Sequence, residues 1–230
     1  MSKPIHQTIK YYYSDLEIIP KQNNQNTQKP DIKVFDGGCF DVLDEYNSDS
    51  LVIHNFANNS IQGGPGSSFT PEGLFIDCYS GSQEGQIIST YQDNIILPKK
   101  MYPICKTDKP GDEALLYSIC GDTLPHVITI ASIVNFDINE PSERQTMLNR
   151  IKLMLVIAAK YNKHLVTGLW GCGIFGCNPS DIATLWKEAV QDANIPKPPG
   201  IIFAIKIDRC SSKWGNFQKL EKLFTGISNE

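Results

Sequence analysis

The chain lacks several features that would place it quickly in a class. Its 230 residues contain no apolar run near the roughly 18 residues of a membrane span, so we expect no membrane association. The formal net charge is -4 without a concentrated basic stretch, which argues against sequence-specific or general binding of nucleic acid. Residues 1–13 show no apolar signal core. We therefore expect a cytosolic protein, with the nucleus as the alternative location.

The cysteines lack the spacing of a metal site or a disulfide framework. There are seven of them, an odd number, and no pair has C-x-x-C spacing. A zinc site or a set of disulfides needs tighter clustering than this. We expect thiols in a reducing compartment, with no metal and no cofactor.

What the chain has is a regular alternation of strand-like and helix-like segments. Apolar, β-branched runs predict strands, and apolar residues at helical spacing or good capping residues predict helices. The predicted strands are 32–35, 51–56, 114–119, 126–132, 164–170 and 200–207; the predicted helices are 39–46, a segment after 80, a long helix from about 141, 178 to about 193, and 214–224. This alternation favours an α/β protein whose sheet is covered on both faces.

The domain organisation is simple. Residues 1–30 are predicted to be an N-terminal peripheral arm, in which residues 9–20 could form a strand and residues 22–28 are a polar loop. No shift in composition divides residues 31–230, so we predict one domain there.

The first candidate binding segment, residues 55–66, directly follows a predicted buried strand. Gly63, Gly64 and Gly66 would let backbone N–H groups approach an anion closely, and Asn58 could bind a sugar hydroxyl. A surface turn without a ligand fits the composition equally well. Residues 57–71 are turn-forming almost throughout.

The second candidate segment, residues 168–181, runs from a buried strand into a capped helix. Gly171, Gly173 and Gly176 suit a diphosphate, and the helix N-terminus would add positive potential. Phe175 would line a pocket, or alternatively fill the core beneath a tight turn. Together the two segments suggest a cleft for a nucleotide diphosphate.

Both segments resemble one known family. LVIHNFANNSIQGG (51–64) resembles the Leu-Asn-Phe-Ala-Asn…Pro-Gly-Gly-Gly segment of microbial-type poly(ADP-ribose) glycohydrolases, a branch of the macro-domain superfamily. LVTGLWGCGIFGCNPSDIATLW (165–186) resembles their Leu-Gly-Ala-Trp-Gly-Cys-Gly-x-Phe-Gly-x-x-Pro segment. The resemblance implies a three-layer α/β/α macro-domain-like fold with a mixed central sheet. The implied partner is ADP-ribose or an ADP-ribosylated protein, and we expect a monomer.

The resemblance also implies roles for individual residues. Asn58 and Phe175 would lie beside the distal ribose, and Asp36 would bind the adenine amino group. The diphosphate would lie between two glycine-rich turns, formed by Gly63, Gly64 and Gly66 and by Gly171, Cys172, Gly173, Ile174 and Gly176.

The catalytic signature of the family is only partly present. A glycine triplet followed by Gln-Glu-Glu is expected, but Pro65 replaces the third glycine, and Gln62 stands where proline is usual. The best match to the acidic motif is Gln83-Glu84-Gly85, in which the usual general acid has become glycine.

This departure leaves the chemistry open between two main hypotheses. Cleaving a glycosidic bond requires a proton donor, which glycine cannot provide. Glu84 is the candidate acid/base and Glu72 the alternative, although either could be a solvated carboxylate. The chain is predicted to hydrolyse ADP-ribosyl or poly(ADP-ribose) O-glycosidic bonds, or alternatively to bind ADP-ribose without turnover. A third reading is a structural protein that has kept the fold and lost the pocket.

Overall fold

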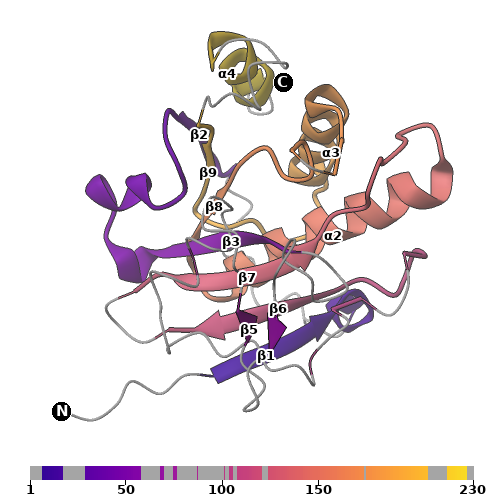
Figure 1. The fold of residues 1–230 in the computed structure, drawn as a ribbon, viewed down its shortest axis with the longest axis horizontal. Helices are drawn as coiled ribbons and strands as arrows, with labels where there is room; N and C mark the ends of the chain where they lie inside the picture. The colour runs from indigo at the N-terminus through magenta and orange to yellow at the C-terminus, as the bar shows by residue number, and fades with distance from the viewer. Residues whose placement is uncertain are drawn as a thin grey trace.

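The strands of the protein form one mixed sheet. The computed structural model describes residues 7–17, 29–57, 68–69, 75–76, 87, 101, 104–105, 108–120, 124–173, 175–206 and 217–226. Within them a seven-stranded sheet has the order β1-β6-β7-β3-β8-β9-β2 (Figure 1). Its strands are β1 (Gln7–Tyr12), β2 (Asp31–Phe35), β3 (Leu51–Ala57), β6 (Ala114–Ile119), β7 (His126–Ala131), β8 (His164–Thr167) and β9 (Gly200–Ala204). A separate pair joins β4 (Ser68–Phe69) to β5 (Phe75–Ile76).

Strand direction divides the sheet into two parts. β7, β3, β8, β9 and β2 are parallel neighbours in that order. β6 is antiparallel to β7, and β1 is antiparallel to β6. The predicted α/β class with a mixed central sheet is therefore confirmed.

Alternating apolar residues bury both faces of this sheet. In β3, Val52 belongs to the main core, whereas Leu51 and Ile53 belong to a second core on the opposite face. The same alternation separates Leu165 from Val166 in β8. The predicted covering of both faces is confirmed, because a strand with apolar residues at successive positions needs a partner on each side.

The main core lies under three helices, α2 (Pro141–Lys160), α3 (Pro179–Gln191) and α4 (Phe217–Thr225). Figure 1 shows these helices together on one side of the sheet. Phe203 of β9 packs edge-on against Trp186 of α3 at 5.3 Å between ring centroids. It also packs against Phe224 of α4 in a tilted arrangement at 4.6 Å. The second core contains Val42 of the short 3-10 helix η2 (Asp41–Asp44) and the helical residue Ile87.

The sheet begins inside the segment that was assigned to the N-terminal arm. β1 forms its antiparallel edge, so the strand alternative for residues 9–20 is confirmed only for residues 9–12. Residues Tyr13–Glu17 form the 3-10 helix η1 instead. The Tyr11 hydroxyl forms a 2.7 Å hydrogen bond with that of Tyr161, whose ring stacks on Tyr117 at 4.0 Å. These aromatic contacts join β1, β6 and the end of α2.

Helix starts match their predicted caps closely. The Asn178 side chain accepts a hydrogen bond from the Ser180 N–H, and Pro179 is the first residue of α3. The long helix starts at Pro141, as predicted. The segment predicted as a helix at 39–46 forms only η2, a 3-10 turn.

Strand ends differ more from prediction. β8 ends at Thr167 rather than at residue 170, because the Trp170 N–H turns back to the Gly168 carbonyl at 2.8 Å. β9 ends at Ala204 rather than at residue 207. The turn predicted for 57–71 was too long, since Ala57 belongs to β3 and residues 68–69 form β4. Ser80, Gln83 and Trp214, which marked predicted helices, lie outside the described residues.

No helix in the described part of the chain is both long enough and apolar enough to cross a membrane.

Candidate functional site

The carboxyl ends of the parallel strands meet at one edge of the sheet. Ala57 of β3 lies opposite Ala131 of β7, and Phe35 of β2 lies opposite Ala204 of β9. Asp36 and the loop 168–178 therefore leave the sheet at the same edge, separated by the width of β9. Strand spacing places their starting points about 10 Å apart.

The structure describes half of the predicted site. Asp36, Gly171, Cys172, Gly173, Phe175 and Gly176 are described, whereas Asn58, Gly63, Gly64, Gly66, Glu84 and Ile174 lie outside the described residues. Ala57, the last described residue before Asn58, lies beside Ala131 at the end of β7.

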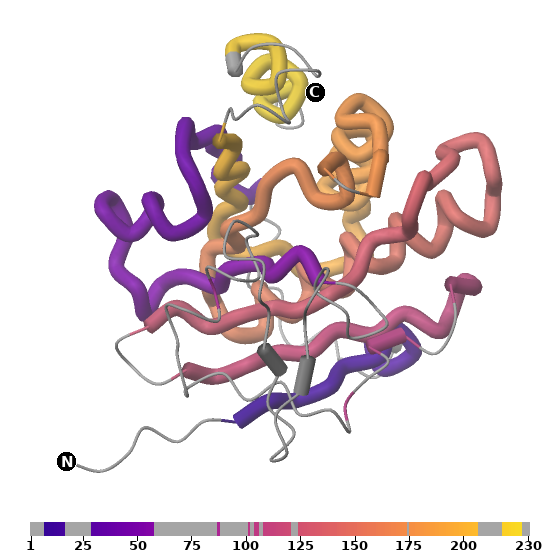
Figure 2. Tube along the Cα trace, viewed as in Figure 1, coloured from indigo at the N-terminus to yellow at the C-terminus, as the bar shows by residue number. Residues whose placement is uncertain are grey.

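The loop after β8 is a compact, internally bonded turn. Figure 2 shows it as the orange tube that arches from β8 to α3. Gly171 and Gly176 have φ angles of 76° and 74°, which favour glycine. The Cys177 N–H donates to the Gly171 carbonyl at 3.0 Å, and the Gly176 N–H donates to the Gly173 carbonyl at 3.1 Å. The predicted tight turn between strand and helix is thus present.

This loop packs directly on the segment that follows β7. A side chain at Gly171 would place its Cβ 2.4 Å from the Ser132 Oγ and 2.8 Å from the Cys177 Sγ. The Asn135 N–H donates to the Phe175 carbonyl at 2.7 Å. The sequence did not single out Ser132 or Asn135 as part of the site. The only sequence signal for them is their position at the end of a predicted buried strand and just after it.

Three N–H groups of the loop make no hydrogen bond within the described part of the chain. Within the described part of the chain, the N–H groups of Gly171, Gly173 and Phe175 donate to no protein acceptor. Gly173 is exposed, and no described atom would lie within 4 Å of a Cβ added there. Successive N–H groups around such a turn can hold an anion.

Phe175 combines the two roles that its sequence context left open. It is half-buried and packs against the main core. Its carbonyl fixes the loop through Asn135, and part of its surface stays accessible. The ring therefore helps to anchor the loop while remaining able to contact a ligand.

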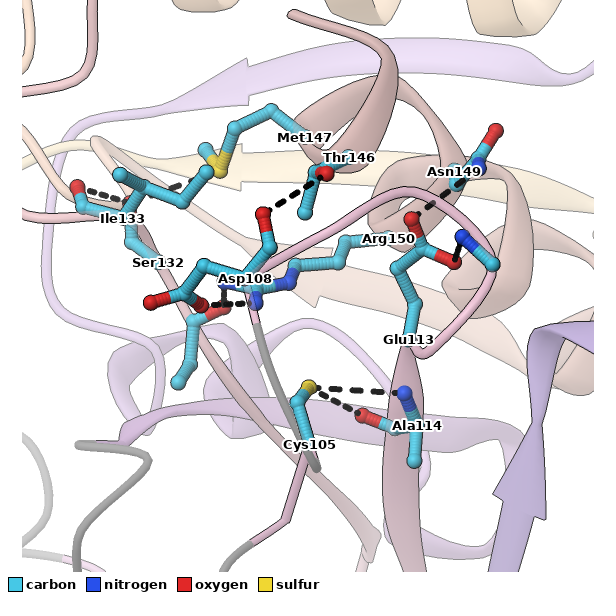
Figure 3. Close-up of polar contacts among 12 residues, drawn as sticks. Cys105, Asp108, Glu113, Ala114, Ser132, Ile133, Thr146, Met147, Asn149 and Arg150 are labelled. Carbon is cyan, nitrogen blue, oxygen red and sulfur yellow. Dashed lines mark hydrogen bonds and ion pairs between the residues drawn. The ribbon is translucent and has the colours of Figure 1, made fainter. Parts of the chain in front are cut away.

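A buried charge network holds the end of β7 in place. The Arg150 side chain on α2 is 0% exposed. Its Nη2 lies 2.6 Å from the Asp108 Oδ1, and its Nη1 donates to the Ala131 carbonyl at 3.1 Å (Figure 3). Ala131 directly precedes Ser132, so this network positions the surface on which the glycine loop packs.

A buried carboxylate, that of Glu113, belongs to the same region. Glu113 accepts hydrogen bonds from the Asn149 Nδ2 at 3.1 Å and from the Gly111 N–H at 2.9 Å (Figure 3). Burial raises the pKa of Glu113, and these hydrogen bonds and the charge of Arg150 oppose that rise. Asn149 and Arg150 of α2 thus bind Glu113 and Asp108, which lie in the chain that leads into β6.

Asp36 lies in an open hollow of about 400 Å³ beside β2. The hollow is lined by Lys33, Val34, Phe35, Asp36, Glu45, Tyr46 and Ile202. Asp36 is exposed, and the Tyr46 hydroxyl accepts a 2.8 Å hydrogen bond from the Lys33 Nζ. Asp36 and Phe35 thus both line this hollow.

The described thiols near the loop do not form a nucleophilic site. Cys172 and Cys177 are free and buried. The Cys177 Sγ donates to the Ile133 carbonyl at 3.4 Å, and burial raises the pKa of this thiol. A raised pKa disfavours the thiolate that would be needed for attack. The described residues contain no cluster of three or more His, Cys, Asp or Glu side chains that could hold a metal.

Comparison with known proteins identifies relatives by structure only. No family model matches the sequence. No curated protein matches it either. One similar solved structure is a point variant of the poly(ADP-ribose) glycohydrolase of Deinococcus radiodurans in complex with ADP-ribose, with a TM-score of 0.65, 16% identity, and coverage of 96% of this chain and 94% of that one. Another is the poly(ADP-ribose) glycohydrolase of Thermomonospora curvata, with a TM-score of 0.60, 15% identity, and coverage of 96% and 85%. These similarities establish a shared fold.

The packing at Gly171 predicts a large difference between two glycines of the same loop. Gly171→Ala should lower the free energy of unfolding by at least about 2 kcal/mol, because it adds a clash to an unfavourable φ. Gly173→Ala should change it by less than about 0.5 kcal/mol, since the added methyl group meets no described atom. Urea unfolding of both variants measures this difference, and equal stabilities would contradict the packing of the loop on Ser132.

Proposed function

We propose that the protein binds ADP-ribose along the carboxyl edge of the sheet, with the diphosphate on the loop 168–178. The observation that carries this proposal is the arrangement of that loop. Its internal hydrogen bonds and its packing on Ser132 fix the backbone, while Gly173 is exposed and three N–H groups of the loop donate to no acceptor in the described part of the chain. A rigid set of N–H donors favours an anion without requiring a lysine or arginine.

The position of Asp36 supports the same ligand. An adenine amino group can donate to a carboxylate, and Phe35 lies in the same hollow. The starting points of Asp36 and the glycine loop are about 10 Å apart, which suits a nucleotide whose base lies over β2 and whose diphosphate lies over β8, with β9 between them. The fold is shared with a glycohydrolase that was solved with ADP-ribose bound.

For the reaction, we propose hydrolysis of an ADP-ribosyl or poly(ADP-ribose) O-glycosidic bond. The similar solved structures are glycohydrolases, which supports this class of reaction. Glu84 is the candidate for delivering the proton to the leaving oxygen, and Glu72 is the alternative. Gly85, where the family signature has its second glutamate, favours the second candidate function, an ADP-ribose-binding module without turnover.

Binding is tested by calorimetry with ADP-ribose. We expect the wild-type protein to bind and Gly173→Ala to bind at least tenfold more weakly, because its methyl group would occupy the place of the diphosphate. Gly226→Ala is the matched control, since no described atom lies within 4 Å of its added Cβ either. Absence of wild-type binding would refute the proposed function. Wild-type affinity in Gly173→Ala would refute the diphosphate assignment alone.

The base contact is tested with a pair of ligands. Wild-type protein should prefer ADP-ribose to its inosine analogue, in which a carbonyl replaces the adenine amino group. Asp36→Asn should reduce that preference about tenfold, because a charged hydrogen bond is lost and the amide can donate to the carbonyl. Glu45→Gln removes another carboxylate of the same hollow and should leave the preference unchanged. An equal loss in both variants would argue against a specific role for Asp36.

Turnover is tested by incubating the protein with poly(ADP-ribosyl)ated and mono-ADP-ribosylated protein. Released ADP-ribose is the product to be measured. Glu84→Gln should lower the rate by about 10²-fold to 10⁴-fold while retaining ADP-ribose binding, whereas Glu72→Gln should remain active. The reverse pattern would assign the acid to Glu72. Binding by the wild-type protein without any release would establish the binding module.

A further inference from the structure

A polar pair lies between the two strands that lead into the candidate loops. His54 of β3 and Thr167, the last residue of β8, are both 0% exposed. The His54 Nδ1 and the Thr167 Oγ1 are 2.9 Å apart. The pairing of Ile53 with Val166 brings these positions side by side. In the two family segments described above, leucine stands at both positions, so here a hydrogen bond occupies the place of an apolar contact.

The imidazole of His54 lies directly against the first part of the glycine loop. Its ring centroid is 5.4 Å from that of Trp170, which is 1% exposed and directly precedes Gly171. On its own strand it packs edge-on against Phe56 at 4.8 Å. The His54 side chain thus contacts Thr167 at the end of β8, Trp170 in the loop that follows β8, and Phe56 on its own strand, β3.

The protonation state of His54 suits a directional contact. Burial lowers the pKa of His54 to about 3, although a hydrogen bond with the Ile130 backbone acts in the opposite direction. The ring is therefore neutral near pH 7 and can either donate to or accept from the threonine hydroxyl. Such a bond fixes the ring plane, which a contact between two leucines would leave free to adjust.

We propose that the His54–Thr167 hydrogen bond is a positioning contact that orients Trp170 and thereby holds the loop 168–178 in the conformation that binds ADP-ribose. The identity of the ligand in this inference rests on the proposed function. The effect of the hydrogen bond on the conformation of the loop does not depend on any ligand. His54 and Thr167 act through Trp170 and do not themselves touch the ligand.

The test measures the loop both with and without a ligand. Hydrogen exchange of the peptide that spans residues 168–178 reports the internal bonds of Cys172, Gly176 and Cys177. Calorimetry reports the affinity for ADP-ribose. Thr167→Val removes the hydroxyl at nearly constant shape, whereas Thr167→Ser retains it.

We expect Thr167→Val to speed exchange in this peptide at least tenfold and to weaken ADP-ribose binding three- to tenfold. Thr167→Ser should retain wild-type behaviour in both measurements. The double variant His54→Leu/Thr167→Leu removes both partners of the His54–Thr167 hydrogen bond together and should fold, yet still bind more weakly than wild type. Tyr11→Phe is the control, because it removes a hydrogen bond at the β1 edge and should change neither measurement.

Unchanged exchange and affinity in both Thr167→Val and the double variant would overturn the proposal and leave the bond a purely structural one. Faster exchange in Tyr11→Phe as well would also overturn it, since the effect would then reflect general stability. If the wild-type protein fails to bind ADP-ribose, the proposed function fails, and the exchange data still decide whether the pair positions the loop.

Discussion

The loop after β8 lies so close to the end of β7 that no side chain fits at residue 171. Ser132 on one side and Cys177 on the other would both overlap an added Cβ. This close approach brings the Asn135 N–H onto the Phe175 carbonyl and leaves Gly173 at the outer surface. The remaining features of the candidate site follow from it, because a loop held at a greater distance would lose these hydrogen bonds and present its N–H groups in other directions.

Buried polar groups fix both strands that take part in this contact. Arg150 binds the last carbonyl of β7, and the His54–Thr167 pair lies at the end of β8. Burial of a charge or an imidazole lowers stability unless its hydrogen bonds are made. Each of these groups has partners whose geometry requires one register of the strands. An apolar core could be as stable, but it would define the positions of the strand ends less sharply.

The fold and the chemistry are set by different parts of the chain. The seven-stranded sheet and its helices provide an edge at which Asp36 and the glycine loop are separated by one strand, β9. That scaffold is shared with poly(ADP-ribose) glycohydrolases at 15–16% identity. Whether a proton can be delivered to a glycosidic oxygen depends instead on the residues between the end of β3 and Ile87. A fold of this kind can therefore serve hydrolysis or recognition, and the site decides between them.

The sequence by itself determined the order and kind of the elements, because apolar alternation and capping residues are local signals. Strands such as 114–119 and the starts of α2 and α3 at Pro141 and Pro179 were predicted correctly for that reason. It also placed Gly171 and Gly176 in the turn between a strand and a helix, where the structure shows that both have positive φ. Only the tertiary structure decided that β8 ends at Thr167, that β1 joins the sheet through β6, and that Ser132 and Asn135 support the glycine loop. These features depend on contacts between residues far apart in the chain, whose distances no local pattern of side chains encodes.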